Sequence, residues 1–144
     1  MLASPEPSNL KGKTICLSSF YISSYFDKAI SVDNSMFENF LLERFKTRFT
    51  LYRIPFEEYP KCSNKSLSLF FDIASTAPVP TGWFAYHLEL NLTDFPKLGV
   101  YIDVYTTYSY GVINKDNAQL TDAMQRYASD LIDKFALDYI SANK

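Results

Sequence analysis

The chain has 144 residues, of which 47% are apolar and 21% are charged, and these values predict one folded globular domain. Its formal net charge is −2 and its basic residues form no broad stripe, so we expect no nucleic-acid partner. No apolar run reaches the roughly 18 residues of a membrane-spanning helix, so none is expected.

Residues 1–12 combine Pro and Ser and lack the charged and apolar regions of a signal peptide, so we predict a linker there. Such a leader is compatible with a mature amino terminus left after a signal was removed. We therefore expect membrane association only through a removed amino-terminal anchor. Residues 13–144 are predicted to form a single α+β domain.

The first element expected in that domain is a strand over residues 14–23, which is apolar on both sides and therefore central in a sheet. Ser35 and Glu38 have the spacing of a capping box and predict the start of a helix. The apolar stripe of this helix is expected to pack in the core, and it consists of Phe37, Phe40, Leu41 and Phe45. A short second strand is predicted over residues 49–54, before Pro55.

Three further strands are expected over residues 66–76, 83–92 and 100–112, joined by connections too short for parallel crossovers. They predict an antiparallel meander. In the last strand, the alternation suggests that Val100, Ile102 and Val104 face the core. The opposite row then faces away from the core, and it includes Tyr101, Asp103 and Tyr105.

An amphipathic helix over residues 117–142 is expected to cover this sheet with its apolar stripe. The predicted fold is therefore α+β, a two-layer sandwich. It has a mostly antiparallel five-stranded sheet with two helices on one face.

Two cysteines, Cys16 and Cys62, are compatible with one disulfide or with two buried thiols. The position of Cys16 inside an apolar strand favours a buried thiol. Two cysteines do not make a metal site, and no metal or other cofactor is expected.

The residue types that carry catalysis are sparse. His87 is the only histidine, and its place on the outward side of a strand favours a surface residue. Asp72, Glu89 and Asp103 lie on three successive predicted strands, so two of them could approach each other if the strands pair in register. Solvent-facing charge is the alternative. We expect that the protein is not an enzyme.

Aromatic residues on the outward side of the sheet are better candidates for a binding function. Trp83, Tyr101 and Tyr105 fall on that side and are predicted to bind a partner, because Trp and Tyr carry much of the binding energy at interfaces. The alternative is that they stabilise the sheet through cross-strand pairs or lie beneath a loop.

The order of strand, helix and second strand in residues 13–20, 37–45 and 49–54 resembles the opening of small bacterial envelope lipoproteins and of the TolB amino-terminal domain. The likeness is one of element order and apolar pattern. The chain departs from it because it has no lipidated cysteine at its amino terminus and no glycine in residues 27–34. No functional residues carry over.

This resemblance implies a non-catalytic component that docks in an envelope assembly or transport complex, in the periplasm or at the outer membrane. We therefore expect an interaction module that binds a partner protein through a sheet face or edge. The alternative function is a helix-grip binder of a small apolar ligand, which requires a cavity between sheet and helix.

Overall fold

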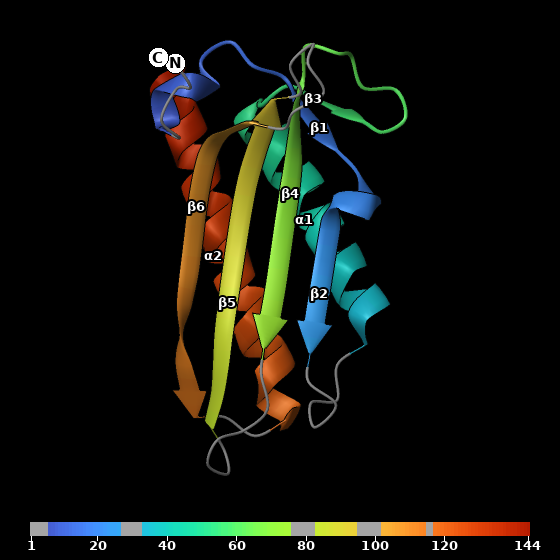
Figure 1. The fold of residues 1–144 in the computed structure, drawn as a ribbon, viewed down its shortest axis with the longest axis vertical. Coiled ribbons are helices and arrows are strands. Elements are labelled where there is room, and N and C mark those ends of the chain that lie inside the picture. The colour runs from blue at the N-terminus through green and yellow to red at the C-terminus, as the bar shows by residue number, and fades with distance from the viewer. Residues whose placement is uncertain (1–5, 27–32, 76–82, 95–101, 115–116) are drawn as a thin grey trace.

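The computed structural model describes residues 6–26, 33–75, 83–94, 102–114 and 117–144 (Figure 1). These described residues form two helices, six strands and two short 3-10 turns. The helices are α1 (Asn34–Tyr52) and α2 (Asn117–Ala142), and the turns are η1 (Pro7–Leu10) and η2 (Ser19–Tyr21). The strands are β1 (Ile15–Leu17), β2 (Ile22–Phe26), β3 (Phe56–Glu58), β4 (Leu67–Ser75), β5 (Trp83–Asp94) and β6 (Ile102–Asn114).

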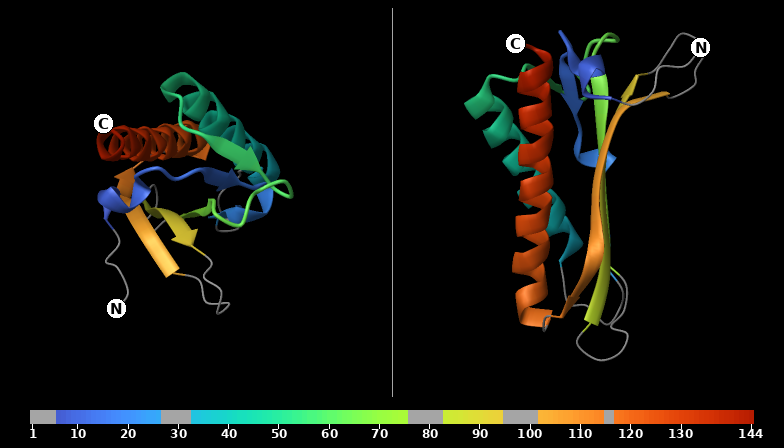
Figure 2. Two further views of the ribbon diagram at one scale, coloured as in Figure 1. Left: turned by 90° about the horizontal axis from the view of Figure 1, so that it is seen from above. Right: turned by 90° about the vertical axis from the view of Figure 1, so that its left-hand side faces the viewer.

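All six strands belong to one sheet in the order β3-β1-β4-β5-β6, with β2 also beside β4. The β4–β5 and β5–β6 pairs are antiparallel, whereas β1 and β2 run parallel to β4. Both helices lie on the same face of the sheet, and we call the other face the open face because no described α-helix covers it (Figure 2). The predicted α+β sandwich is confirmed, with six strands instead of five.

The sheet contains one more strand than expected because the predicted strand over residues 14–23 is interrupted. Cys16 pairs with Ser68 and Ile22 pairs with Phe71, so this part of the chain advances six positions against three on β4. The surplus residues form η2, where the Ser18 Oγ accepts a hydrogen bond from the Phe20 N–H at 3.1 Å.

The first helix begins earlier than the capping-box pattern indicates. Asp33 caps it, because its Oδ1 accepts a hydrogen bond from the Met36 N–H at 3.1 Å. Glu38 does not reach back to the helix start as a capping box requires. Its Oε1 instead accepts hydrogen bonds from Ser24 on β2, so the capping-box prediction was wrong.

The predicted strand over residues 49–54 was also wrong, since α1 continues to Tyr52. The buried residues of the helix recur at every fourth position, and the last of them is Phe49. Extending the helix by one more turn places this ring in the core. Arg53 then ends the helix in a left-handed conformation, and a short strand, β3, follows Pro55.

Aromatic rings fill the interface between the sheet and the two helices. Phe45 of α1 contacts Phe71 of β4, with ring centroids 5.5 Å apart. Phe135 of α2 contacts both Phe49 and Tyr105, at 5.7 and 5.4 Å. All five rings are fully buried, so the interior is packed by large side chains reaching from both layers.

The amino-terminal segment belongs to the folded domain from Glu6 onward. Leu10 is fully buried. The Val104 carbonyl accepts hydrogen bonds from the Glu6 N–H at 3.2 Å and from Asn9 Nδ2 at 2.8 Å. The linker prediction for residues 1–12 was therefore wrong for residues 6–12, and residues 1–5 lie outside the described part.

A disulfide joins Cys16 of β1 to Cys62, which follows β3. The interpretation of the two cysteines as buried thiols was therefore wrong. The bond closes a 46-residue separation that contains the whole of α1. It fixes β1 and the segment after β3 to each other at one end of the sheet.

Candidate functional site

Tyr105, a predicted binding residue on the last strand, faces the core, whereas Asp103 of the same predicted row is exposed. Tyr105 points into the core with 1% of its surface exposed, and its hydroxyl donates a hydrogen bond to Asp138 Oδ2 at 2.6 Å. The prediction that Tyr105 faces outward was therefore wrong. Trp83 begins β5 but its side chain lies outside the described part of the structure, and so does the whole of Tyr101.

The reversal has a simple origin in the strand register. Tyr105 pairs with the buried Leu92, whereas Asp103 pairs with Thr93, so a bulge leaves Val104 as an extra residue. The residues on the two sides of this strand are similar in polarity, so alternation alone does not decide between them. The register with β5 decides, because it sets Tyr105, Thr107 and Ser109 opposite leucines of the core.

The residues that face outward from β6 form what we call the tyrosine strip, which consists of Tyr108, Tyr110 and Val112. Their exposed fractions are 59%, 69% and 61%. The rings of Tyr108 and Tyr110 stack with centroids 5.8 Å apart and planes inclined by 18°. Residues of this size normally bury their apolar surface, so this contiguous exposed set is a candidate contact surface.

Acidic residues lie beside the tyrosine strip on the open face of the sheet. Asp72 of β4 is directly opposite Glu89 of β5, so the register brings together two of the three carboxylates selected from the sequence. Asp103 instead accepts a hydrogen bond from the Thr93 hydroxyl at 3.1 Å. His87 is exposed beside Tyr110, as predicted for a surface histidine.

A second group of aromatic residues flanks the same face near the disulfide. Phe20 and Tyr59 are both exposed and pack edge to face, with centroids 6.0 Å apart. Tyr21 lies over Phe70 of β4 at 4.4 Å. The open face therefore carries aromatic groups on two flanks and carboxylates between them.

The two long outer strands of the sheet differ in how their edges are covered. On β2, both the N–H and the hydroxyl of Ser24 donate to Glu38 Oε1, at 3.1 and 2.9 Å, and the Ser24 carbonyl accepts from Asn34. Helix α1 therefore blocks that edge. On β6, only the Val104 carbonyl receives such bonds within the described residues.

A groove runs beside the open part of the β6 edge, and we call it the edge groove. It has a volume of about 270 Å³ and is lined by Tyr108, Ser109, Tyr127, Asp130, Leu131 and Lys134. Tyr127 of α2 forms part of its wall and stacks on Tyr86 at 5.1 Å. The groove thus has an apolar wall and one charged group of each sign.

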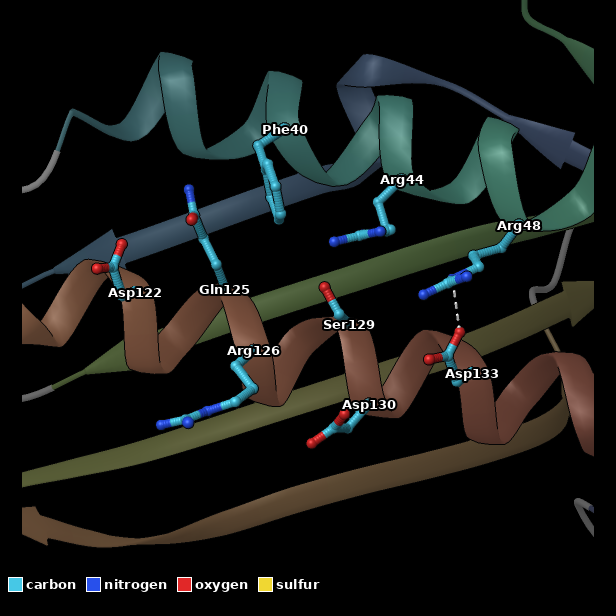
Figure 3. Close-up of a pocket in the computed structure, with 9 residues that line it drawn as sticks. All are labelled: Phe40, Arg44, Arg48, Asp122, Gln125, Arg126, Ser129, Asp130 and Asp133. Carbon is cyan, nitrogen blue, oxygen red and sulfur yellow. Dashed lines mark ion pairs between the residues drawn. The ribbon is translucent and has the colours of Figure 1, made fainter.

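A second groove lies between the two helices, and we call it the interhelix groove (Figure 3). It has a volume of about 340 Å³ and is lined by Phe40, Arg44, Arg48, Asp122, Gln125, Arg126, Ser129, Asp130 and Asp133. Arg48 Nε lies 2.8 Å from Asp133 Oδ1. Arg44 and Arg48 are both half-buried in this groove.

The described residues contain no group of three or more His, Cys, Asp or Glu side chains placed to hold a metal ion. Neither described helix combines the length and apolar character needed to cross a bilayer.

No family model matches this chain, and no curated protein sequence is similar to it. One solved structure, of an uncharacterized protein, matches with a TM-score of 0.52 at 7% identity, over 96% of this chain and 95% of that chain. This likeness shows a shared fold.

Two other solved structures match less well. A minor lipoprotein from Acinetobacter baumannii has a TM-score of 0.36 at 14% identity, over 82% of this chain and 86% of its own. A PelC dodecamer from Paraburkholderia phytofirmans has a TM-score of 0.37 at 10% identity, over 96% and 92%. Similarity at this level carries no argument about function.

Proposed function

We propose that this protein is a non-enzymatic interaction module of the bacterial cell envelope. In this proposal it binds a partner protein through the β6 edge and the adjoining open face. The observation that carries the proposal is the coincidence of the tyrosine strip with an edge that no described element pairs beyond Val104. An extended segment can pair with such an edge through backbone hydrogen bonds.

The chemistry of the surface specifies what the partner segment would carry. Side chains on one side of an added strand would contact Tyr108 and Tyr110, and those on the other side would enter the edge groove. Apolar or aromatic residues suit both places. A basic residue of the partner would face the carboxylates of Asp72 and Glu89 on the open face.

The proposed location rests on the disulfide and on the sequence resemblance. Disulfides such as Cys16–Cys62 form and persist in oxidising compartments, which in bacteria means the periplasm or the cell exterior. The resemblance to envelope lipoproteins points to the same place. We therefore propose the periplasm or the periplasmic side of the outer membrane, with any membrane contact made through a removed amino-terminal anchor.

The alternative of a helix-grip binder is less well supported. Such a protein would hold its ligand between sheet and helices, where the described residues place large rings in mutual contact. The grooves described above lie instead at the surface.

Site-specific photo-crosslinking in living cells tests the proposed surface. A photoreactive residue at Tyr110 should capture one discrete protein. The same group at Leu137 serves as a matched control, because Leu137 is also an exposed apolar residue but lies on α2. Equal capture at both positions, or none at Tyr110 or Val112, would contradict the proposed surface.

A further inference from the structure

Buried polar atoms without a hydrogen-bond partner gather in the interhelix groove. In the described part of the chain these side-chain atoms are Arg44 Nε, Arg48 Nε, Ser129 Oγ and Asp133 Oδ1. All four belong to residues that line this groove. Nearly every buried polar atom in a native protein is hydrogen-bonded, so a cluster of exceptions requires an explanation.

Two of the four atoms compensate each other electrostatically. Arg48 Nε and Asp133 Oδ1 are 2.8 Å apart, but the N–H does not point along the line to the oxygen, so the contact is an ion pair and not a hydrogen bond. The charges of these two residues cancel.

Arg44 has no such compensation. Among the described residues no carboxylate lies within ion-pair distance of it, and its guanidinium carbon is 5.4 Å from the centroid of the Phe40 ring. Figure 3 shows Arg44 reaching from α1 toward α2, whereas Arg126 and Asp130 point away from α1. Arg44 is therefore a charged residue of the groove without an ion-pair partner among the described residues, and the carboxylate of Asp122 lies at one end of the groove (Figure 3).

Ser129 provides a second donor from the opposite helix. It is only 9% exposed, and its side chain points from α2 toward α1 (Figure 3). A serine inside a helix commonly donates to the carbonyl four residues earlier. The Ser129 hydroxyl makes no hydrogen bond to any described group, so it is free to donate to a ligand.

We propose that the interhelix groove binds a small organic carboxylate. Its oxygens accept hydrogen bonds from Arg44 and Ser129, and its organic part packs against the Phe40 ring. A single negative charge neutralises Arg44, whereas a phosphate dianion would place excess negative charge near Asp133. The groove volume of about 340 Å³ lies within the range of small-molecule sites.

This site shares Asp130 with the edge groove of the proposed partner surface, but its four unpartnered atoms belong to residues that do not line the edge groove. The helices cover one face of the sheet (Figure 2), and the tyrosine strip is exposed on β6. Either proposal can therefore fail without the other.

NMR titration of the whole ¹⁵N-labelled protein with benzoate tests the assignment, with phosphate at the same concentrations and ionic strength as the second arm. Benzoate should produce saturable shifts at the Ser129 amide and at the Nε–H resonances of Arg44 and Arg48. Phosphate should produce none. Saturable binding of phosphate at these resonances would overturn the carboxylate assignment.

Variants locate the binding. Arg44→Gln should weaken benzoate binding about tenfold or more, the loss expected for one charge-assisted hydrogen bond. The affinity of Arg44→Lys for benzoate should lie between those of the original protein and Arg44→Gln, because lysine keeps the positive charge but lacks the planar guanidinium group. Lys65→Gln is the matched control, since it removes an exposed positive charge on a loop outside the groove, and it should bind like the original protein.

Ser129→Ala gives an independent readout. It should weaken benzoate binding and raise the melting temperature of the ligand-free protein, because it removes a buried hydroxyl without a partner. A lower melting temperature would show that the hydroxyl is bonded within the fold. That result, or the absence of saturable benzoate shifts in the original protein, would overturn the proposal.

Discussion

Tyr105 is a fully buried residue whose hydroxyl reaches a carboxylate at the surface of α2. Its hydrogen bond to Asp138 is 2.6 Å long, and Lys134 Nζ lies 3.2 Å from the same carboxylate oxygen. Burial, and secondly the bond to Asp138, raise the pKa of Tyr105 above its ordinary value of 10.0. Tyr105 therefore links β6 to α2 through a hydrogen bond that requires its hydroxyl group to be protonated.

Replacing Tyr105 by phenylalanine should lower the free energy of unfolding by about 1–2 kcal/mol at neutral pH. The ring stays packed, and Asp138 keeps Lys134, so only the hydrogen bond is lost. Urea unfolding measures the change. Tyr110→Phe is the control and should have no effect, because that ring is exposed.

Tyr105 should also make the protein less stable in alkali. The unfolded chain releases this proton near pH 10, while the folded protein keeps it because the folded pKa is raised. The contribution of this raised pKa to the free energy of unfolding is complete below pH 10. Above pH 10 it falls by about 1.4 kcal/mol for each pH unit. Unfolding between pH 8 and pH 11 should show a shallower decline in Tyr105→Phe, and identical declines would contradict the assignment.

Side-chain orientation on β6 shows what the sequence could not provide at the level of the residue. The sequence of β5 alternates clearly between apolar and polar residues, and its Leu88 and Leu90 are buried. The orientation of Tyr105 did not follow from such an alternation, because both sides of β6 carry tyrosines and small polar residues. The partner strand and a bulge beside Leu92 settle it, and neither can be read from local spacing.

At the scale of the elements, Glu38 protects one edge of the sheet. Its carboxylate binds the Ser24 N–H and hydroxyl, at 3.1 and 2.9 Å. Replacing Glu38 by alanine should lower the free energy of unfolding by about 1–2 kcal/mol, because the Ser24 N–H loses its partner. Glu38→Gln keeps a hydrogen-bond acceptor, so its free energy of unfolding should fall less than that of Glu38→Ala. If both variants were as stable as the original protein, the proposed protection of this edge would be wrong.

The disulfide should be a major contribution to stability. For a 46-residue separation the chain-entropy model gives about 4 kcal/mol. The variant that combines Cys16→Ala with Cys62→Ser should lose most of this stabilisation, as measured by urea unfolding. Adding a reductant should destabilise the original protein and leave the variant unchanged.

The helices and the meander could be predicted because their apolar patterns are long and regular. Helix α2 covers the residues 117–142 expected for it, and β4 and β5 lie close to their predicted positions. The short elements could not be predicted. The end of α1 was misassigned because Phe49 fits both a strand and a further helical turn. The division of β1 from β2 was missed because the short turn η2 between them has no periodic pattern.

At the scale of the whole molecule, the two faces of the fold differ in what they offer. One face of the sheet is covered by α1 and α2 (Figure 2), and the interhelix groove lies between these helices. The other face exposes aromatic residues and carboxylates. The sequence predicted exposed aromatic residues on the sheet, but of the residues selected Tyr105 is buried, whereas Tyr108 and Tyr110 are exposed. The central claim is that the β6 side of the open face binds the partner protein.

The affinity of the purified partner for matched variants tests this claim most directly. Tyr108→Thr combined with Tyr110→Thr removes both exposed rings and keeps residues suited to a strand. This variant should weaken binding by about tenfold or more without lowering the melting temperature, whereas Leu137→Ser on α2 should bind normally. Unchanged affinity in the double variant, with a loss in Leu137→Ser, would contradict the account.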